Sequence, residues 1–471
     1  MVELRHHQRR VWEGWFPEEA EEWWEQWMKQ ADQVLDDEAL LETVHQAQGR
    51  RRPNSRLRGR KQTPAEVTLR LAVLKHMRNW SFEQTEREVR ANVVYRQFTR
   101  IGAEKVPDAK TIARLVQTLG AEVLKQIHQR LVEVAREKKV VRGRKLRVDT
   151  TAVETNIHYP TDSSLLGDSA RVLTRTMKKI TEVTGKAGTR LRDRMRTIRL
   201  RVMEIARTSR SQGPQLERKM KQGYRKLLTA TRKVVNQAKR FQEEIVRGVK
   251  HVRDGQQKVK LRVLREDLEK MLPRVKQVIR QTKARVLGGD VHVPGKLVSV
   301  FEPSTEVIRR GKASKPNEFG KMVKIQEAEN QIVTDYEVFE KRPSDSDLLV
   351  PAVEKHQVQF GRVPRLVAGD AAFYSASNER ELEEMGVKQI SVPNRSTKSA
   401  ERRRHQKKRS FRKGQKWRTG SEGRISVLKR RHGLNRCRYR GDVGMQRWVG
   451  LAVIADNLIN IGRFLAANNT G

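Results

Sequence analysis

Three carboxylates from distant parts of this chain could together hold a metal ion. Asp149 lies in the strand-like stretch KLRVDTT, Asp370 closes the stretch RLVAGD, and Glu422 is almost alone among cations in RTGSEGRISVLKR. A strongly basic chain has little reason to place an acid among cations unless that acid is paired or binds a metal. Hard divalent cations prefer carboxylate oxygens. The three acids therefore predict a divalent-metal site for phosphodiester chemistry, in which two ions about 4 Å apart activate a water and stabilise the leaving oxygen.

The charge of the chain indicates a polyanionic partner. Its 471 residues include 100 lysines and arginines against 56 acids, a formal net charge of +44. Nucleic acid is the expected partner, and an acidic membrane surface is the alternative. The longest apolar stretch, 449–467, is interrupted by polar residues, and its apolar residues recur every three or four positions. We therefore expect an amphipathic core helix there and no membrane partner.

The cysteine content and the N-terminus indicate a cytoplasmic protein. The single cysteine, Cys437, excludes an intramolecular disulfide and a cysteine-based zinc site. The chain opens with polar and acidic residues and has no signal-peptide core. A reducing cytosol fits both observations.

Residues 1–48 differ from the rest of the chain because they are acidic and hold five of the eight tryptophans, Trp12, Trp15, Trp23, Trp24 and Trp27. We expect one or two helices, with Pro17 near the first helical position. Two interpretations stay open. This acidic arm could pack on a basic part of its own chain or of a second subunit, or it could be a helical cap that covers its tryptophans.

Residues 49–140 are predicted to be a helical DNA-binding domain that begins with a basic linker, 49–62. Thr63, Ser81 and Asp108 are expected N-caps of helices, and Gln84 stands three residues after Ser81, as a capping box requires. A series of short helices with a polar face is compatible with a helix-turn-helix. A plain helical bundle is the alternative.

The segments that carry the acids, 141–166 and 289–471, are predicted to form an α/β domain with a mixed sheet and flanking helices. Alternation and β-branched residues indicate strands in 141–162, 293–301, 321–340, 365–370 and 387–394, the third of them bent or split, and helices in 344–361 and 375–386. Glu422 is expected in the first turn of a helix that runs to about Arg431.

Residues 167–288 are predicted to be a long helical insertion. Apolar residues recur there at heptad-like spacing, as in antiparallel helices packed on a narrow seam. Residues 170–287 contain 35 basic and 10 acidic residues, a net charge of +25. A structural coiled coil usually balances its flanking charges, so a role in following a phosphate backbone is favoured over an oligomerisation spacer.

Candidate DNA contacts cluster near Glu422 and in the helical domain. The basic run within 395–418 is expected to be a loop that crosses the active site and grips DNA. Arg418 and Lys429 flank Glu422 and could hold phosphate oxygens. The full set of predicted DNA contacts is Arg418, Lys429, Arg402, Arg403, Arg404, Lys407, Lys408, Arg114 and Lys110.

The arrangement resembles the DDE transposases of bacterial insertion sequences, most closely the ISNCY-type members. The resemblance rests on RVDTTAVETNIHYPTDSSLLGD, EPSTEVIRRGKASKPNEFGK, VAGDAAFYS and RTGSEGRISVLKRRHGLNRCRYRG, and it covers roughly residues 60–465. Many relatives carry a tyrosine, arginine, glutamate and lysine at fixed spacing. Arg418, Glu422 and Lys429 match that spacing, whereas Gln415 stands at the tyrosine position. The long insertion between Asp149 and Asp370 also departs from better-known relatives, which insert a domain after the second aspartate.

The resemblance implies a ribonuclease-H-like catalytic core with Asp149, Asp370 and Glu422 as catalytic and metal-binding residues. It implies two Mg²⁺ ions, with Mn²⁺ as the alternative, and double-stranded DNA as partner in the form of terminal inverted repeats and target DNA. Pairing of two ends implies a homodimer or higher oligomer. The expected function is metal-dependent strand cleavage and 3′-hydroxyl strand transfer. The alternatives are a non-catalytic basic nucleic-acid-binding protein and a ribonuclease-H-type nuclease without strand transfer.

Overall fold

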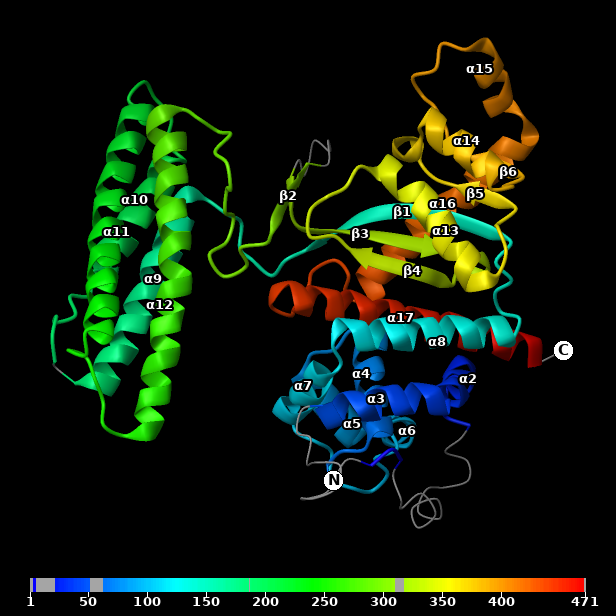
Figure 1. The fold of residues 1–471 in the computed structure, drawn as a ribbon, viewed down its shortest axis with the longest axis horizontal. Coiled ribbons are helices and arrows are strands. Elements are labelled where there is room, and N and C mark those ends of the chain that lie inside the picture. The colour runs from blue at the N-terminus through cyan, green and yellow to red at the C-terminus, as the bar shows by residue number, and fades with distance from the viewer. Residues whose placement is uncertain (1–2, 6–21, 51–61, 186, 310–316, 470–471) are drawn as a thin grey trace. The chain divides into compact units, whose positions relative to one another are not determined.

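A computed structural model describes residues 3–5, 22–50, 62–185, 187–309 and 317–469 of the chain. These residues divide between two compact units (Figure 1). One unit combines Met1–Asn156 with Ile308–Gly471, and the other is Ile157–Val307. Trp12, Trp15 and Pro17 of the acidic arm, and most of the basic linker 49–62, lie outside the described residues.

Short helices make up the N-terminal part of the first unit: α2 (Gln26–Leu35), α3 (Glu38–Arg50), α4 (Ala65–Met77), α5 (Phe82–Ala91), α6 (Val93–Phe98), α7 (Ala109–Thr118) and α8 (Ala121–Glu137). Local hydrogen bonds start two of them as predicted. Ser81 and Gln84 form a reciprocal capping box at α5, and the Asp108 carboxylate accepts the backbone N–H of Thr111 at 2.9 Å. The predicted cap at Thr63 is wrong, because Pro64 occupies the N-cap position of α4 in an extended conformation and no side chain caps that helix.

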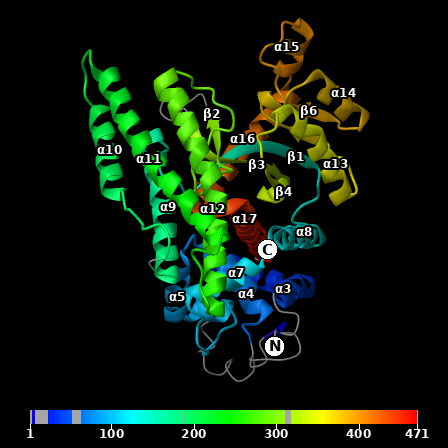
Figure 2. The same ribbon diagram turned by 60° about the vertical axis from the view of Figure 1, so that its left-hand side comes forward.

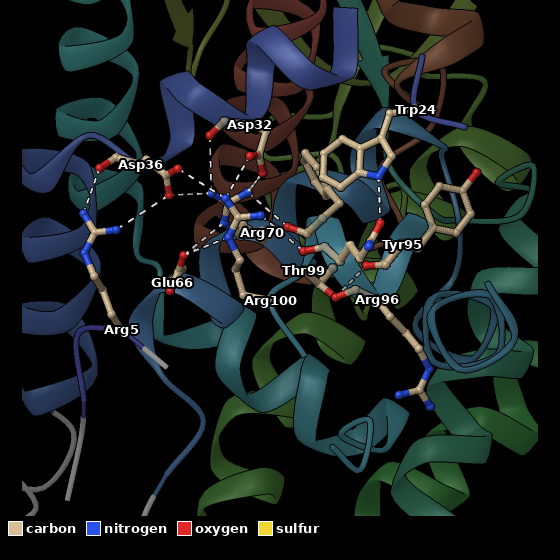
Figure 3. A network of polar contacts seen from close by, with 12 residues as sticks. Arg5, Trp24, Asp32, Asp36, Glu66, Arg70, Tyr95, Arg96, Thr99 and Arg100 are labelled. Atoms are coloured by element: carbon tan, nitrogen blue, oxygen red, sulfur yellow. Dashed lines mark hydrogen bonds and ion pairs between the residues drawn. The ribbon is translucent and has the colours of Figure 1, made fainter. Parts of the chain in front are cut away.

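A buried network of ion pairs joins α2 to α4 (Figure 3). The fully buried guanidinium of Arg70 on α4 donates to the carboxylates of Asp32 (2.5 Å) and Asp36 (2.9 Å) on α2, and to the carbonyl of Phe98 (3.0 Å). Arg100 contacts the same two carboxylates at 2.8 and 3.2 Å. Buried charges are tolerated when they are paired in this way. The described part of the acidic arm therefore packs on basic residues of its own chain.

The mixed sheet predicted from the sequence is confirmed. Its strands among the described residues are β1 (Lys145–Glu154), β2 (Glu306–Arg309), β3 (Asn317–Glu327), β4 (Val333–Val338), β5 (Leu366–Ala368) and β6 (Gln389–Ser391). They are arranged in the order β2-β3-β1-β5-β6, with β4 paired to β3. β1 runs antiparallel to β3 and parallel to β5, and β5 runs parallel to β6.

Two of the strand predictions have opposite outcomes. Residues 321–340 split into β3 and β4 around the short helix η4 (Glu329–Gln331), as predicted. The strand predicted over 293–301 is wrong, because that segment packs on a helix. Val300 is buried in the apolar core of the second unit, and the backbone of Leu297 bonds twice to the side chain of Gln281, at 2.8 and 2.9 Å.

Helices cover both faces of the sheet (Figure 1). Leu146 and Val148 of β1 pack in one apolar core with residues of α13 (Leu349–Phe360) and α14 (Ala376–Glu384), whereas Val153 packs with α16 (Arg409–Arg431) and α17 (Gly441–Asn469). Alternate residues of a strand point to opposite faces. Arg147 and Asp149 therefore lie on the face that α16 covers.

The basic loop predicted within 395–418 is wrong, because this segment is helical. α15 (Ala400–Lys407) is capped by the Ser399 hydroxyl, which accepts the N–H of Arg402 at 3.2 Å, and α16 begins directly afterwards at Arg409. Phe411 is buried, and its carbonyl accepts the Ser391 hydroxyl of β6 at 2.8 Å. Glu422 consequently lies in the middle of α16 and not in its first turn.

α17 is the core helix predicted over 449–467. By length and composition its apolar window could cross a membrane, but 72% of that window is buried inside the protein. Its polar residues have partners within the protein: Asp456 pairs with Arg424 at 2.6 Å, and the Asn457 side chain bonds to the backbone of Val333 at 2.8 and 2.9 Å. A membrane would leave such groups unpaired.

The second unit is a bundle of long helices that share one apolar seam, as predicted (Figure 2). It contains α9 (Asp162–Thr184), α10 (Met195–Thr208), α11 (Leu216–Val246), α12 (Gly255–Thr282) and the π-helical turn η3 (Lys283–Leu287). The seam is formed by buried residues such as Leu173, Ile198, Leu227 and Leu268. Helix begins at Asp162, five residues before the predicted start of the insertion, because Thr161 forms a capping box with Ser164.

Candidate active site

Asp149 within β1 and Asp370 just after β5 lie at the same level of two neighbouring parallel strands. Arg147 of β1 is paired with Ala368 of β5, and each acid follows its member of that pair by two residues. β5 ends at Ala368, so Asp370 lies in the turn beyond it, where its carboxylate accepts the N–H of Ala372 at 2.9 Å. The strand therefore ends two residues earlier than predicted. The pairing of β1 with β5 nevertheless places Asp149, in the middle of β1, beside the end of β5, where Asp370 follows.

The carboxylate of Asp149 is half-buried and hydrogen-bonded. It accepts the Ser421 hydroxyl of α16 at 3.0 Å and the N–H of Thr150 at 2.8 Å. Burial raises the pKa of Asp149 and the negative charge of Asp370 raises it further, which outweighs the lowering by these two hydrogen bonds and by Arg418. Two carboxylates of like charge that lie close together are stabilised by a cation between them.

Glu422 directly follows Ser421 on α16, and its side chain is bonded to Arg418. Its side chain is 63% exposed and accepts a hydrogen bond from Arg418 at 2.6 Å, whereas the Arg418 side chain is 14% exposed. In the part of the chain that the structure describes, no three His, Cys, Asp or Glu residues are grouped closely enough to hold a metal ion. The structure thus brings two of the three predicted acids together and places the third one residue after Ser421, which contacts Asp149.

Two glycines allow α16 to lie close to the sheet. A Cβ atom on Gly420 would collide with the guanidinium of Arg147, and one on Gly414 would approach the Cβ of Ser391 to 2.6 Å. Real Cβ atoms do not make contacts this short, so a larger residue at either position would force the helix, or the side chain that it meets, to move. The position of Glu422 over the sheet depends on these two small residues.

Gln415 ties α16 to the turn that carries Asp370. Its amide donates to the carbonyl of Gly369 at 3.2 Å and to the carbonyl of Ser391. Gly369 immediately precedes Asp370 in the chain. Many relatives in the resembled family carry tyrosine at the position of Gln415. In this protein Gln415 instead bonds to the backbone at the ends of β5 and β6.

A buried ion pair lies under the same part of α16. The Arg147 guanidinium donates to the Glu327 carboxylate of β3 at 2.9 Å and to the carbonyl of Trp417 at 2.5 Å. The side chains of Arg147 and Glu327 are 7% and 1% exposed. Burial raises the pKa of Glu327 although Arg147 opposes that shift. Because Arg147 precedes Asp149 by two residues, this pair fixes α16 directly beside the predicted site.

Most of the predicted DNA contacts lie on the surface. Lys110 and Arg114 are exposed on α7, and the exposed cations of α15 and the residue that follows it are Arg403, Arg404, Lys407 and Lys408. Lys429 is half-buried near the end of α16. These exposed cations can reach a ligand without rearrangement of the backbone.

Arg402 and Arg418 differ from the other predicted contacts because they already have partners within the protein. The Arg402 guanidinium donates to Glu379 and to the carbonyl of Val392 at 2.9 Å, and its side chain is 12% exposed. It holds α15 against α14 and is not available to DNA in this conformation. Arg418 is paired with Glu422.

Two family models match this chain. Residues 21–118 match the model described as "Transposase domain (DUF772)", and residues 382–461 match the model described as "Transposase DDE domain". Both matches support a DNA transposase. The first segment covers helices α2 to α7, and the second contains Glu422 but neither Asp149 nor Asp370. Together the two segments span less than half of the 471 residues. A search of the curated proteins finds no match, and a search of the solved structures finds none either.

The donor set fits a divalent metal in part. DDE transposases generally use divalent metals. Asp149 in the middle of β1 and Asp370 just beyond the end of β5 supply hard carboxylate oxygens from adjacent strands, and the pKa of Asp149 is raised partly by Asp370. Glu422, which is paired with Arg418, does not form a three-carboxylate group with these two aspartates among the described residues.

The sequence prediction missed Ser421, Arg147 and Gln415. Each stands close in the chain to a predicted residue: Ser421 precedes Glu422, Arg147 precedes Asp149 by two positions on the same strand face, and Gln415 is the departure from the family pattern. Strand alternation could have placed Arg147 on the face of Asp149. Nothing in the sequence could have shown that α16 crosses that face.

Proposed function

We propose that this protein is the DNA transposase of an insertion sequence, of the DDE type that the sequence resembles. The observation that supports this most strongly is the alignment of Asp149 with Asp370 beneath a helix that carries Glu422. The two matches to transposase domains support the same conclusion. The ribonuclease-H-like description of the core and the ISNCY-type assignment belong to this proposal.

In this proposal Asp149, Asp370 and Glu422 hold the divalent ions. When bound, Mg²⁺ supplies an activated oxygen nucleophile and stabilises the leaving oxygen of the phosphodiester. Asp149 is kept in place by Ser421, and Asp370 by the N–H of Ala372. Arg418 is placed to pair with a DNA phosphate once Glu422 has turned inward.

The DNA contacts in this proposal come from three parts of the chain. The exposed cations of α7 bind the terminal inverted repeats together with the other N-terminal helices. The basic face of α15 and one side of the helical unit Ile157–Val307 follow the phosphate backbone. Two protein copies are needed to hold two element ends. The protein acts in the bacterial cytoplasm, where its DNA lies.

A nicking assay tests the chemistry. The purified protein is incubated with Mg²⁺ and a labelled duplex that carries the inverted repeat flanking the gene. Asp149→Asn and Asp370→Asn are expected to abolish nicking while binding persists, because the amide keeps the shape and removes the charge. Glu384→Gln on α14, which is exposed, serves as the matched control and keeps nicking.

The same assay separates the alternatives. Joining of the nicked 3′ end to a supercoiled plasmid distinguishes a transposase from a nuclease that only cleaves. Binding without any metal-dependent nicking by the wild type indicates a non-catalytic DNA-binding protein. Undiminished nicking in both aspartate variants would overturn the catalytic assignment.

A further inference from the structure

The helical unit Ile157–Val307 contains an open groove between α9 and α10. The groove has a volume of about 600 Å³. Its lining includes five cations, Arg171, Arg175, Lys178, Arg196 and Arg199, and one acid, Asp193. Such a volume falls within the range of ligand-binding clefts.

The cations form two stripes that line the same groove from opposite sides. Arg171, Arg175 and Lys178 are spaced by four and three residues along α9, and Arg196 and Arg199 by three along α10. Residues three or four apart share one side of a helix. Each helix therefore presents a cationic edge to the groove.

Internal acids neutralise only part of this charge. Arg171 is paired with Asp168 at 2.5 Å, and Lys178 with Asp193 at 2.7 Å. Arg175, Arg196 and Arg199 are exposed and form no ion pair within 4 Å among the described residues, although Asp193, whose pKa is lowered mainly by Lys178, also lies close enough to feel the charge of Arg199. Packed helices normally place opposite charges along their shared edges, and like charges that face each other are destabilising. An anionic ligand between the stripes removes that repulsion.

The shape of the groove favours a repeating anion with apolar parts. Arg171 and Lys178 are seven residues apart, which is about 10 Å along the axis of α9. Successive phosphates of one DNA strand are about 3.4 Å apart along the duplex axis, so this length matches roughly three phosphates. The lining also includes the apolar side chains of Leu200 and Met203, which are 54% and 47% exposed. Deoxyribose offers a matching apolar surface between phosphates. The membrane alternative is less favoured, because a flat bilayer surface does not enter a groove between two helices.

We propose that the α9–α10 groove is a binding site for the phosphodiester backbone of duplex DNA. This inference rests on the proposed function and deepens it, because it assigns the contact to one groove of the helical unit and names its residues. Arg175, Arg196 and Arg199 each neutralise one phosphate. Leu200 and Met203 pack against the sugars.

The test compares two variants of the full-length protein that lose the same charge. The groove variant carries R175Q, R196Q and R199Q. The control variant carries R225Q, R232Q and R240Q on α11, where all three arginines are exposed and none lines the groove. Binding of a labelled 30-base-pair duplex is measured between 50 and 200 mM salt, and circular dichroism checks that both variants keep their helix content.

The salt dependence distinguishes the groove from diffuse charge. Each neutralised phosphate contributes about 0.9 to the slope of log affinity against log salt, so the groove variant should have a slope shallower by about 2.7. Over this fourfold salt range the wild type should then lose about 40-fold more affinity than the groove variant. The slope of the control variant should stay close to that of the wild type. Equal slopes in the two variants would overturn the proposal.

Two further measurements separate this inference from the proposed function and from a membrane role. In a parallel titration, vesicles containing phosphatidylserine replace the duplex. If the groove variant loses vesicle binding but keeps the DNA binding of the wild type, the groove assignment is overturned. Nicking at saturating DNA tests the chemistry independently. Absent nicking with the slope difference intact would refute the catalytic proposal alone, whereas intact nicking with equal slopes would refute the groove alone.

Discussion

Replacing Arg147 by methionine should destabilise the mixed sheet strongly, because it leaves the Glu327 carboxylate buried without its partner. Glu327 is 1% exposed, and its two oxygens are both contacted by Arg147. Removal of one member of a buried ion pair typically costs about 3–5 kcal/mol. The variant also loses the bond from Arg147 to the carbonyl of Trp417. The double variant R147M/E327L should recover most of the loss, because apolar residues of similar volume replace both charges.

The loss should depend on pH in a defined direction. Burial already raises the pKa of Glu327 above its ordinary value of 4.5, and without Arg147 the pKa rises further. A carboxyl group whose folded pKa lies above its unfolded pKa costs stability as pH rises between the two values. R147M should therefore lose more stability at pH 7.5 than at pH 5.

Hydrogen exchange in urea measures this prediction in the relevant part of the chain. Peptides from β1 and β3 report the opening free energy of the sheet separately from the helical unit. E327Q is a second single variant, which leaves Arg147 buried with a neutral partner. Losses below about 1 kcal/mol in both single variants, or a double variant no more stable than R147M, would refute the reasoning.

Two further predictions concern the placement of α16 and the charge of Asp149. G420A should displace α16, because the new Cβ collides with Arg147, and it should lower the nicking rate by up to about a hundredfold, the cost of roughly 1 Å of misplacement. G423A on the same helix is the control: its new Cβ meets nothing within 4 Å, so this variant should gain about 1 kcal/mol of stability and keep its nicking rate. Equal nicking rates in the two variants would contradict the close-packing argument. S421A removes a hydrogen bond that lowers the pKa of Asp149, so the acidic limb of the pH–rate profile for nicking should move to higher pH. If that limb does not move, Asp149 does not titrate in it.

Features fixed by neighbouring residues could be predicted from the sequence. The capping box of Ser81 and Gln84 and the cap at Asp108 depend on hydrogen bonds that span three residues, so the local pattern determines them. The split of 321–340 into two strands follows from alternation on either side of a turn.

Features fixed by distant partners could not be predicted. The alternating segment 293–301 has the pattern of a strand, but it meets a helix and not a sheet edge. The basic run before Glu422 is expected from its sequence to be a loop that grips DNA, yet contacts of Phe411 and Gly414 with β6 stabilise it as a helix. The alignment of Asp149 with Asp370 depends on which strands become neighbours, and periodicity carries no information on strand order.

Along the chain, the whole helical unit Ile157–Val307 lies between β1 and its partner strand β3, so the ribosome makes β1 well before β3. Arg147 and its partner Glu327 are 180 residues apart in the chain. At about 5–20 residues per second, β1 waits roughly 10 to 40 s before β3 emerges. During that interval the long helices, whose contacts are mostly between neighbours in the chain, can form first. β1 meanwhile exposes open edges to other nascent chains, so this strand is where a slowed or truncated translation product would begin to aggregate.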